Sequence, residues 1–295
     1  MATSLANSTQ VTNDIPYAAP LKIGTVTLRV RDLRSMSRYY EHLLGLRVLS
    51  SDGHIARLGN RGTTLLELIG DPEAEPRTPG GAGLFHTAFL LPNRIQLALW
   101  TKHAVDNRFL ITGASDHAVS EAIYLSDPEG NGIEVYADRP REEWQHLESQ
   151  IKMVTEPLDI ESLLTSASGT WNGFPDEGVI GHVHLQIGAL DMAESFYRTV
   201  LGFDISCRYS GATFFGSGDY HHQLATNAWA SRGAGPRAEG SAGLVSVEVL
   251  TDKSLIAPIR ERAKSAGALT AENSTGLTLR DPWNIEVRVR PSEAA

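Results

Sequence analysis

The sequence predicts an α+β fold made of four β-α-β-β-β modules. The first observation is an internal repeat: the segment that starts at Ile23, IGTVTLRVRDLRSMSRYYEHLLGL, aligns without gaps with the segment that starts at Ile180, IGHVHLQIGALDMAESFYRTVLGF. The second is a weaker pair, GLFHTAFLLP from Gly83 and GLVSVEVLTD from Gly243. Self-similarity of this kind indicates one supersecondary unit that recurs along the chain. We therefore predict modules near residues 21–70, 83–137, 179–228 and 242–290.

Each copy of the stronger repeat predicts a strand, then a helix, then further strands. Apolar residues alternate from Val26 to Val30, which is typical of a strand with one buried face. The amphipathic stretch that follows predicts a helix that ends at Gly45, because glycine suits a left-handed helix cap. Short strands are predicted near residues 54–58 and 63–69.

The weaker pair continues into a helical stretch, a turn and an Asp-Pro, which reads YLSDPEGNGIEVY in one copy and LRDPWNIEVRV in the other. The chain thus divides into a flexible N-terminal tail (1–20), an N-terminal half (21–137), a connector (138–178) and a C-terminal half (179–290). Within the connector we predict a helix that starts at Pro140, since proline suits the first turn of a helix.

Composition limits the class of protein. The 295 residues include 26 Lys and Arg against 35 Asp and Glu, a net charge of −9, which disfavours nucleic acid and anionic lipid as partners. Cys207 is the single cysteine, so thiolate-rich metal sites and intrachain disulfides are excluded, and any metal must be held by His and carboxylate. The sequence lacks a recognisable signal peptide or long apolar run, so we expect a cytoplasmic protein without membrane contact.

The modules resemble those of the vicinal oxygen chelate superfamily, the glyoxalase and extradiol dioxygenase fold. The resemblance covers nearly everything after residue 20. The segments GASDHAVSEAIYLSDPEGNGIEVYADRPREEW, IGHVHL and YHHQLATNAW are similar to the catechol 2,3-dioxygenase-like branch. The resemblance implies that modules pair into two cup-shaped half-barrels, with metal ligands on inward side chains: a His on first strands and a carboxylate on one last strand.

The first-strand position reads Thr25, His86, His182 and Ser246 in modules 1 to 4. The carboxylate position is Glu134 in module 2. In module 4 the turn DPWN looks shorter than DPEGN, so alignment on Asn284 puts Val287 at that position and turns Glu286 away.

Pairing of the modules within each half would leave no complete ligand set. If module 2 pairs with module 3, and module 1 with module 4, then His86, His182 and Glu134 meet in one cup, and this is the pairing we predict. Two imidazoles and one carboxylate leave three positions open, as an Fe(II) oxygenase requires; Mn(II) is the alternative. His184 faces the same side of its strand as His182 and is the alternative ligand. A degenerate site without metal is the opposing hypothesis.

Three further residues are candidates for proton transfer. Ring cleavage needs a proton acceptor and donor near the metal, which suits imidazole. Tyr220-His221-His222-Gln223 resembles the His-His pair of extradiol dioxygenases. Adjacent strand residues face opposite sides, so we assign His222 to the cup and His221 to a surface or inter-module contact. His117 and Tyr124 resemble the family's His and Tyr that bind the substrate oxygen or dioxygen, whereas Asp116 suits a turn or an orienter of His117.

These expectations combine into an extradiol dioxygenase that uses Fe(II) and O₂ to open a small catechol-type aromatic, as in aromatic hydrocarbon catabolism. The resemblance also allows a homodimer through the outer strands. Two alternatives remain: a glyoxalase-like, metal-dependent isomerase or thiol transferase, and a metal-free protein that binds an aromatic ligand.

Overall fold

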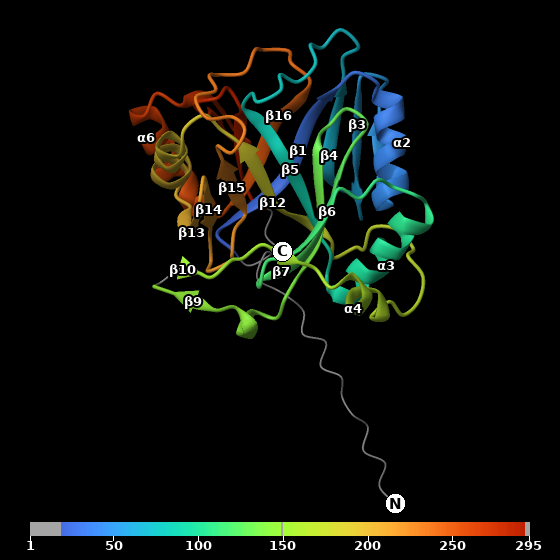
Figure 1. Ribbon diagram of the computed structural model, residues 1–295. Helices are drawn as coiled ribbons and strands as arrows, with labels where there is room; N and C mark the ends of the chain where they lie inside the picture. The colour runs from blue at the N-terminus through green and yellow to red at the C-terminus, as the bar shows by residue number, and fades with distance from the viewer. Residues whose placement is uncertain (1–18, 149, 293–295) are drawn as a thin grey trace, which may run out of the picture.

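The computed structural model describes residues 19–148 and 150–292, so nearly all of the predicted tail lies outside the described residues. Strands form two large, curled sheets (Figure 1). The first has the order β17-β18-β19-β16-β1-β4-β3-β2 and the second β11-β6-β7-β8-β5-β12-β15-β14-β13. The strands of the first sheet are β1(Leu21–Val30), β2(Arg47–Ser51), β3(Ile55–Asn60), β4(Thr63–Gly70), β16(Gly243–Thr251), β17(Leu269–Asn273), β18(Gly276–Arg280) and β19(Glu286–Pro291). Those of the second are β5(Gly83–Leu90), β6(Gly113–Asp116), β7(Ser120–Ser126), β8(Gly132–Asp138), β11(Glu156–Pro157), β12(Val179–Gln186), β13(Asp204–Tyr209), β14(Ala212–Gly216) and β15(Leu224–Asn227).

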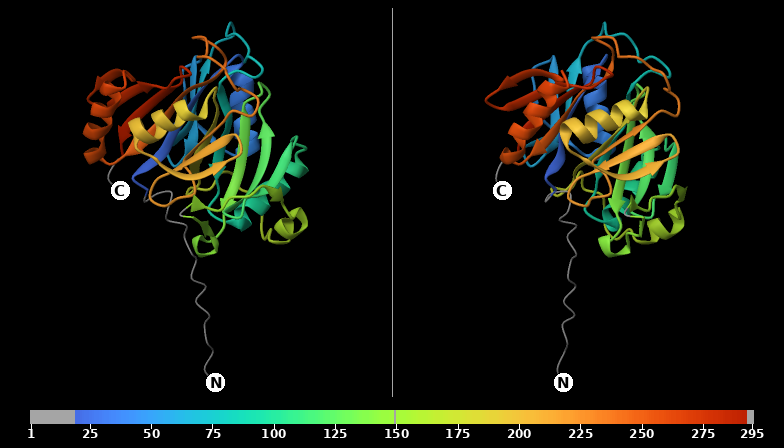
Figure 2. Two further views of the ribbon diagram at one scale, coloured as in Figure 1. Left: turned by 60° about the vertical axis from the view of Figure 1, so that its left-hand side comes forward. Right: turned by 90° about the vertical axis from the view of Figure 1, so that its left-hand side faces the viewer.

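The modules pair across the two halves of the chain, as predicted. In the first sheet β1 runs antiparallel to β16, with Thr27 opposite Ser246, which joins modules 1 and 4. In the second sheet β5 runs antiparallel to β12, with His86 opposite His184, which joins modules 2 and 3. The two sheets meet through these central strands, because β1 packs on β12 and β16 on β5 (Figure 2).

Helices cover the outer faces of the sheets and close the core. They are α2(Leu33–Leu44), α3(Arg94–Asp106), α4(Ile160–Thr165), α5(Leu190–Glu194) with the π-helical turn η2(Ser195–Leu201), and α6(Lys253–Ser265). Asp32 caps the start of helix α2, and its side chain accepts from the Ser35 backbone N–H. Gly45 caps the end of the helix in the left-handed conformation, as predicted. Leu, Val and Ile side chains from one face of each strand pack against these helices.

The connector differs from the prediction. A helix from Pro140 was expected, but only a single 3₁₀ turn, η1(Arg141–Glu143), forms, followed by the two-stranded ribbon β9(His146–Leu147) and β10(Gln150–Ile151). The Trp144 indole donates to the Arg139 carbonyl and is buried with Val119 and Tyr220. Tertiary burial of this tryptophan therefore outweighs local helix propensity and turns the chain back toward the second sheet.

The module 4 register also differs from the prediction. The Asp127 carboxylate accepts from the backbone N–H of residues 129 and 131, and Asp281 accepts in the same way from residues 283 and 285. The two turns thus have equal length. In the sheets Ala88 lies opposite Glu134, and the corresponding Glu248 lies opposite Arg288. Arg288, not Val287, therefore occupies the carboxylate position, and Glu286 lies on the same face as Arg288.

Arg288 and its neighbours fill the concave face of the first sheet with ion pairs. The Arg288 Nε lies 2.7 Å from Glu286 Oε1, and Glu67 Oε2 lies 2.8 Å from Arg57 Nε. A cation at the position of Glu134 means that this cup lacks the ligand set of the other one.

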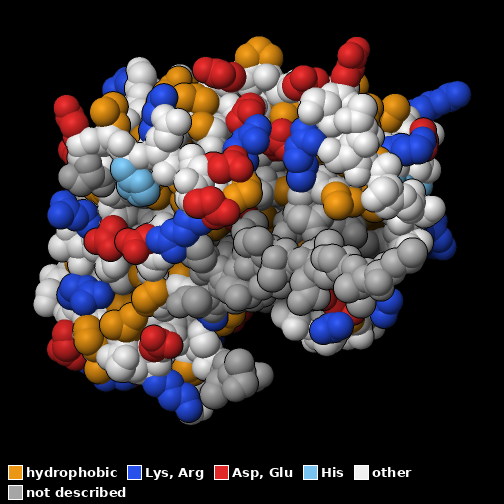
Figure 3. Space-filling model, turned by 90° about the horizontal axis from the view of Figure 1, so that it is seen from below, with side chains coloured by type: hydrophobic (Ala, Val, Ile, Leu, Met, Phe, Trp, Pro, Cys, Tyr) orange, Lys and Arg blue, Asp and Glu red, His pale blue; other side chains and the backbone are white. Residues whose placement is uncertain are grey.

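Two surface observations complete the fold. On the face seen in Figure 3, acidic and basic side chains are interspersed outside the grey atoms. Among residues 19–148 and 150–292, no helix is both long and apolar enough to cross a bilayer.

Candidate metal centre and active site

Three side chains from neighbouring strands converge in the second sheet. The Glu134 Oε2 atom lies 2.9 Å from His86 Nε2 and 3.2 Å from His182 Nε2, and the two Nε2 atoms are 3.3 Å apart. His86 lies on β5, Glu134 on β8 and His182 on β12, and β5 pairs with both of the other strands. The group thus draws His86 and Glu134 from module 2 and His182 from module 3.

Burial and charge suit this group to metal binding. Burial lowers the pKa of His182 to about 4 and outweighs Glu134, which raises this pKa. The His182 imidazole is therefore neutral at physiological pH. Burial alone would raise the pKa of Glu134, but His182 and His86 outweigh it and hold this pKa well below its usual range. A neutral imidazole and an ionised carboxylate are the forms that bind a metal ion.

The spacing of the donor atoms also fits one ion. With metal–ligand bonds of ~2.1 Å, donor atoms at adjacent corners of an octahedron lie about 3 Å apart. The three observed separations match this spacing. Within the described residues, these are the His, Cys, Asp and Glu side chains that gather closely enough for a metal site. Two histidines and one carboxylate on one face are the ligand set of non-haem Fe(II) oxygenases.

His184, the alternative ligand, has a different environment. Its Nε2 lies 3.0 Å from the Asn227 amide nitrogen, and its ring stacks edge-on against His86. Since an amide nitrogen can only donate, it occupies the lone pair of His184 Nε2. Burial and the neighbouring histidines hold the pKa of His184 well below its usual range. The structure thus brings His182 to the carboxylate and places His184 one layer away.

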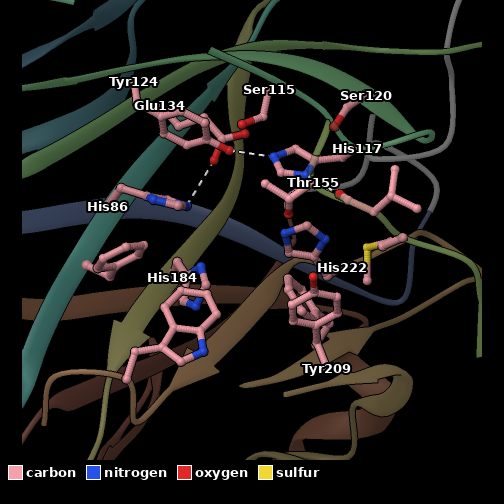
Figure 4. A pocket seen from close by; sticks show the side chains of 15 residues that line it. His86, Ser115, His117, Ser120, Tyr124, Glu134, Thr155, His184, Tyr209 and His222 are labelled. Atoms are coloured by element: carbon pink, nitrogen blue, oxygen red, sulfur yellow. Dashed lines mark hydrogen bonds and ion pairs between the residues drawn. The ribbon is translucent and has the colours of Figure 1, made fainter. Parts of the chain in front are cut away.

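His117 and Tyr124 form a hydrogen-bonded pair beside the candidate metal ligands (Figure 4). The His117 Nδ1 lies 2.6 Å from the Val154 carbonyl and its Nε2 lies 2.6 Å from the Tyr124 hydroxyl. Because a carbonyl can only accept, Nδ1 carries the proton in the neutral ring and the Tyr124 O–H donates to Nε2. Burial, and then Glu134, raise the pKa of Tyr124 well above its usual value, so the phenol stays protonated.

Asp116 has a structural role at the end of β6. Its carboxylate accepts from the Ala118 backbone N–H and binds Arg139 at 2.5 Å. The first contact is the turn role that the sequence suggested. Orientation of His117 comes from the Val154 carbonyl instead.

His221 and His222 belong to a chain of hydrogen bonds between modules. The Asp138 Oδ1 lies 2.8 Å from His221 Nε2, and the His221 Nδ1 lies 2.7 Å from His222 Nδ1. The Tyr220 hydroxyl donates to the other oxygen of Asp138 at 2.9 Å. His221 therefore makes the predicted inter-module contact. The strand argument for it was wrong, however, because both histidines precede β15 in a loop and both are buried.

This chain fixes the tautomers of both rings. A carboxylate can only accept, so the proton of neutral His221 is on Nε2 and its Nδ1 accepts from His222 Nδ1–H. The remaining nitrogen of His222, Nε2, then carries a lone pair. Burial, and then His182, hold the pKa of His222 well below its usual range, so this lone pair is available at neutral pH.

A cavity of about 400 Å³ connects these groups (Figure 4). His86, Glu134, His117, Tyr124 and His222 all line it. The rest of the lining is Phe85, Ser115, Ser120, Met153, Val154, Thr155, His184, Tyr209, Phe214 and Trp229. Trp229 lines the cavity, whereas Phe174 is buried in the core and Trp171 packs against that core.

Sequence reasoning missed three contributors to the site. Asp138 follows Glu134 by four residues on β8, so strand alternation places both carboxylates on one face and could have identified it. The Val154 carbonyl and the wall formed by residues 153–155 come from the connector, where no sequence pattern marks a backbone contact. Asn227 pairs with His184 from β15, a contact that requires the sheet register.

Comparisons with known proteins agree with the fold. The family model for the Glyoxalase/Bleomycin resistance protein/Dioxygenase superfamily matches residues 22–135 and 179–287. The chain is 38% identical over 267 residues to a protein of Bacillus subtilis (strain 168) named Catechol-2,3-dioxygenase, with 88% of this chain and 93% of the relative covered.

Solved structures share the architecture at lower identity. A putative dioxygenase from Bacillus subtilis subsp. subtilis str. 168 superposes with a TM-score of 0.63 at 12% identity, over 92% of this chain and 86% of that chain. Glyoxalase I from Zea mays superposes with a TM-score of 0.57 at 15% identity, over 94% of this chain and 95% of that chain. At such identities the likeness extends to the fold alone.

Proposed function

We propose a ring-cleaving oxygenase function for this chain, which belongs to the Glyoxalase/Bleomycin resistance protein/Dioxygenase superfamily. The activity is extradiol cleavage: a catechol-type aromatic and O₂ give a ring-opened semialdehyde. The observation that carries the proposal is the His86–His182–Glu134 group in one cavity with His222 and the His117–Tyr124 pair. The 38% identity to a protein named Catechol-2,3-dioxygenase supports it.

His86, His182 and Glu134 would hold Fe(II), with Mn(II) as the alternative metal. When bound, such an ion supplies adjacent open positions for a catecholate and for dioxygen, and lets electron density pass from one to the other. The protein residues then have to bind the ring, exclude water and move protons at defined atoms.

His222 serves as the general base and acid in this proposal. Its Nε2 lone pair would accept the proton of a substrate hydroxyl, and the His222 imidazolium would return it as the O–O bond breaks, with both oxygen atoms kept in the product. Asp138, acting through His221, holds the ring so that Nε2 is the accepting atom. The lowered pKa of His222 matches this role, because the imidazole must be unprotonated before it can accept a proton.

Tyr124 and His117 form a second contact for a substrate oxygen in this proposal. Since the Tyr124 O–H donates to His117, its oxygen lone pairs are free to accept from a substrate hydroxyl that enters the cavity. The raised pKa of Tyr124 keeps it a neutral hydrogen-bonding group.

The test is anaerobic reconstitution with Fe(II), addition of catechol and then air, with absorbance and metal content recorded on the same sample. We expect a yellow product that depends on iron. His222→Ala should retain the metal and lose turnover, because it removes the base and leaves the three ligands.

Stoichiometric metal without colour across a panel of catechols would contradict ring cleavage and favour an isomerase or transferase. Absence of bound metal would contradict both and favour an aromatic-binding protein.

A further inference from the structure

The cavity lining combines two chemically different sets of side chains. Imidazole and phenol groups surround the Glu134 carboxylate, and Phe85, Phe214 and Trp229 together with Met153 form an apolar wall beside them. Among residues 19–148 and 150–292, the side chains that line the cavity include no Lys and no Arg. The part of a ligand that lies beyond the metal ligands thus meets apolar and aromatic surface without a cation.

The aromatic wall is held in place before any ligand arrives. The Trp229 indole donates to the Ser210 carbonyl at 2.8 Å. Gly211 has a φ of +76°, in the left-handed region, and a Cβ there would lie 2.7 Å from the Trp229 ring. Trp229 also meets the Phe85 ring edge-on, with centroids 5.7 Å apart. The indole therefore has a fixed orientation that only glycine at position 211 permits.

Two of these rings are exposed although they are large and apolar. Trp229 is 51% exposed and Phe85 is 38% exposed, both at the cavity. A ligand with an apolar extension would cover them and gain the free energy of burying both its own surface and theirs. A single ring bound at the metal ligands would not need a wall of this size, since about 400 Å³ is within the ~300–1,000 Å³ range of pockets for larger organic ligands.

Charge balance points the same way. The negative end of the ligand, the catechol oxygens, belongs with the metal and the imidazoles. A carboxylate on the far end would lose its hydration against Phe214, Met153 and Trp229 without a cationic partner in the lining. Such desolvation is costly unless an opposite charge compensates it.

We propose, on the basis of the ring-cleaving function above, that the substrate is a catechol with an uncharged, bulky apolar substituent such as a second aromatic ring. Trp229 is the residue that determines this specificity, with Phe85 beside it. Catechols with a carboxylate side chain bind more weakly.

The test measures binding rather than turnover, so that it is independent of the oxygen reaction. Iron-loaded full-length protein is titrated anaerobically by calorimetry with catechol, 2,3-dihydroxybiphenyl and 3,4-dihydroxyphenylacetate. We expect 2,3-dihydroxybiphenyl to bind about tenfold or more tighter than 3,4-dihydroxyphenylacetate. In Trp229→Ala this affinity ratio should fall about tenfold.

Two variants sharpen the interpretation. Tyr209→Arg places a cation in the lining at a side chain that is 48% exposed, and it should raise the affinity for 3,4-dihydroxyphenylacetate alone. Leu147→Ala removes an exposed apolar side chain outside the cavity and should leave the ratio unchanged. Equal affinity for the two substituted catechols, or a ratio that survives Trp229→Ala, would overturn the specificity proposal while ring cleavage stands. Failure of every catechol to bind iron-loaded protein would overturn both.

Discussion

At the scale of single residues, the role proposed for His222 depends on which of its ring nitrogens faces the cavity. The Asp138–His221–His222 chain answers this with two hydrogen bonds, and each has one possible donor once the carboxylate is taken as acceptor. In the proposed mechanism, Asp138 thus positions the base without contact with the substrate.

Asp138→Asn tests this role. An amide can donate to His221 Nε2 and reverse the tautomers along the chain, so we expect kcat to fall about 10–100-fold with iron content unchanged. Steady-state kinetics and metal analysis on the same preparation measure both. Tyr220→Phe is the control, because it removes a donor to Asp138 but leaves the carboxylate on His221. An Asp138→Asn enzyme with the wild-type kcat would reduce the chain to a packing contact.

The roles of single residues could be predicted where a sequence repeat aligned them. They could not be predicted where a contact depends on a backbone group or on the sheet register. His86, Glu134 and His182 were expected together because each occupies a repeated position, and the structure brings them within hydrogen-bonding distance. For His222, the position at the cavity was predicted but the loop that carries it was not. The loop before β15 buries both histidines, and strand alternation cannot describe a loop.

At the scale of elements, the repeat predicted the strands and the helix of module 1 because alternation, amphipathicity and a glycine cap agree there. The helix predicted for the connector was wrong because burial of Trp144 is a tertiary effect, which the local sequence does not reveal. The predicted register of module 4 was wrong by one position because the alignment matched Asn284 to Asn131 by residue type. The Asp side chains show that Ile285 is the structural counterpart of Asn131.

Gly181 and Gly24 occupy equivalent positions in the repeat, yet they differ in what a side chain would meet. A Cβ at Gly181 would overlap the Tyr136 hydroxyl, which lies in the core and bonds Tyr220. A Cβ at Gly24 would meet only the end of the Glu248 side chain, which can move.

We therefore expect Gly181→Ala to lower the free energy of unfolding by about 1–3 kcal/mol, the usual range for overpacking, and Gly24→Ala to lower it by less. Urea unfolding of both variants measures the difference. Equal losses in the two variants would show that Tyr136 can relocate without cost and that its contact with Tyr220 is not required.

At the scale of the whole molecule, the cross-pairing of modules follows from the distribution of ligands along the sequence. Neither half contains a complete set, so only an arrangement that joins modules 2 and 3 completes one. The sheet order has that arrangement. The sequence could not predict the content of the other cup, because its Arg288 and Glu286 pairing depends on the register of β19.

Burial of three neutral histidines makes the metal-free fold sensitive to acid. The pKa of His182 is about 4 in the fold against an ordinary value of 6.5, and burial also lowers the pKa of His184 and of His222. The unfolded chain thus binds more protons below pH 6.5, so stability is complete above this pH and falls toward pH 4. His182 alone accounts for about 3 kcal/mol over this window.

Asp281 acts in the opposite direction, because burial raises its pKa to about 6, and it offsets part of this loss. Urea unfolding of the metal-free protein at pH 7.5 and 5 should show the net loss. The exposed His54 provides the control variant His54→Asn, which should keep the wild-type pH dependence. Stability that does not change over this range would contradict the buried, neutral state of the three rings.

The central claim is that modules 2 and 3 build one metal site from His86, His182 and Glu134. The most direct measurement is iron stoichiometry after anaerobic loading and dialysis of wild type, His86→Ala, His182→Ala and His184→Ala. We predict about one iron per chain in wild type and in His184→Ala, and loss of iron in His86→Ala and in His182→Ala. Iron retained in both of the latter variants, or lost from His184→Ala alone, would contradict it.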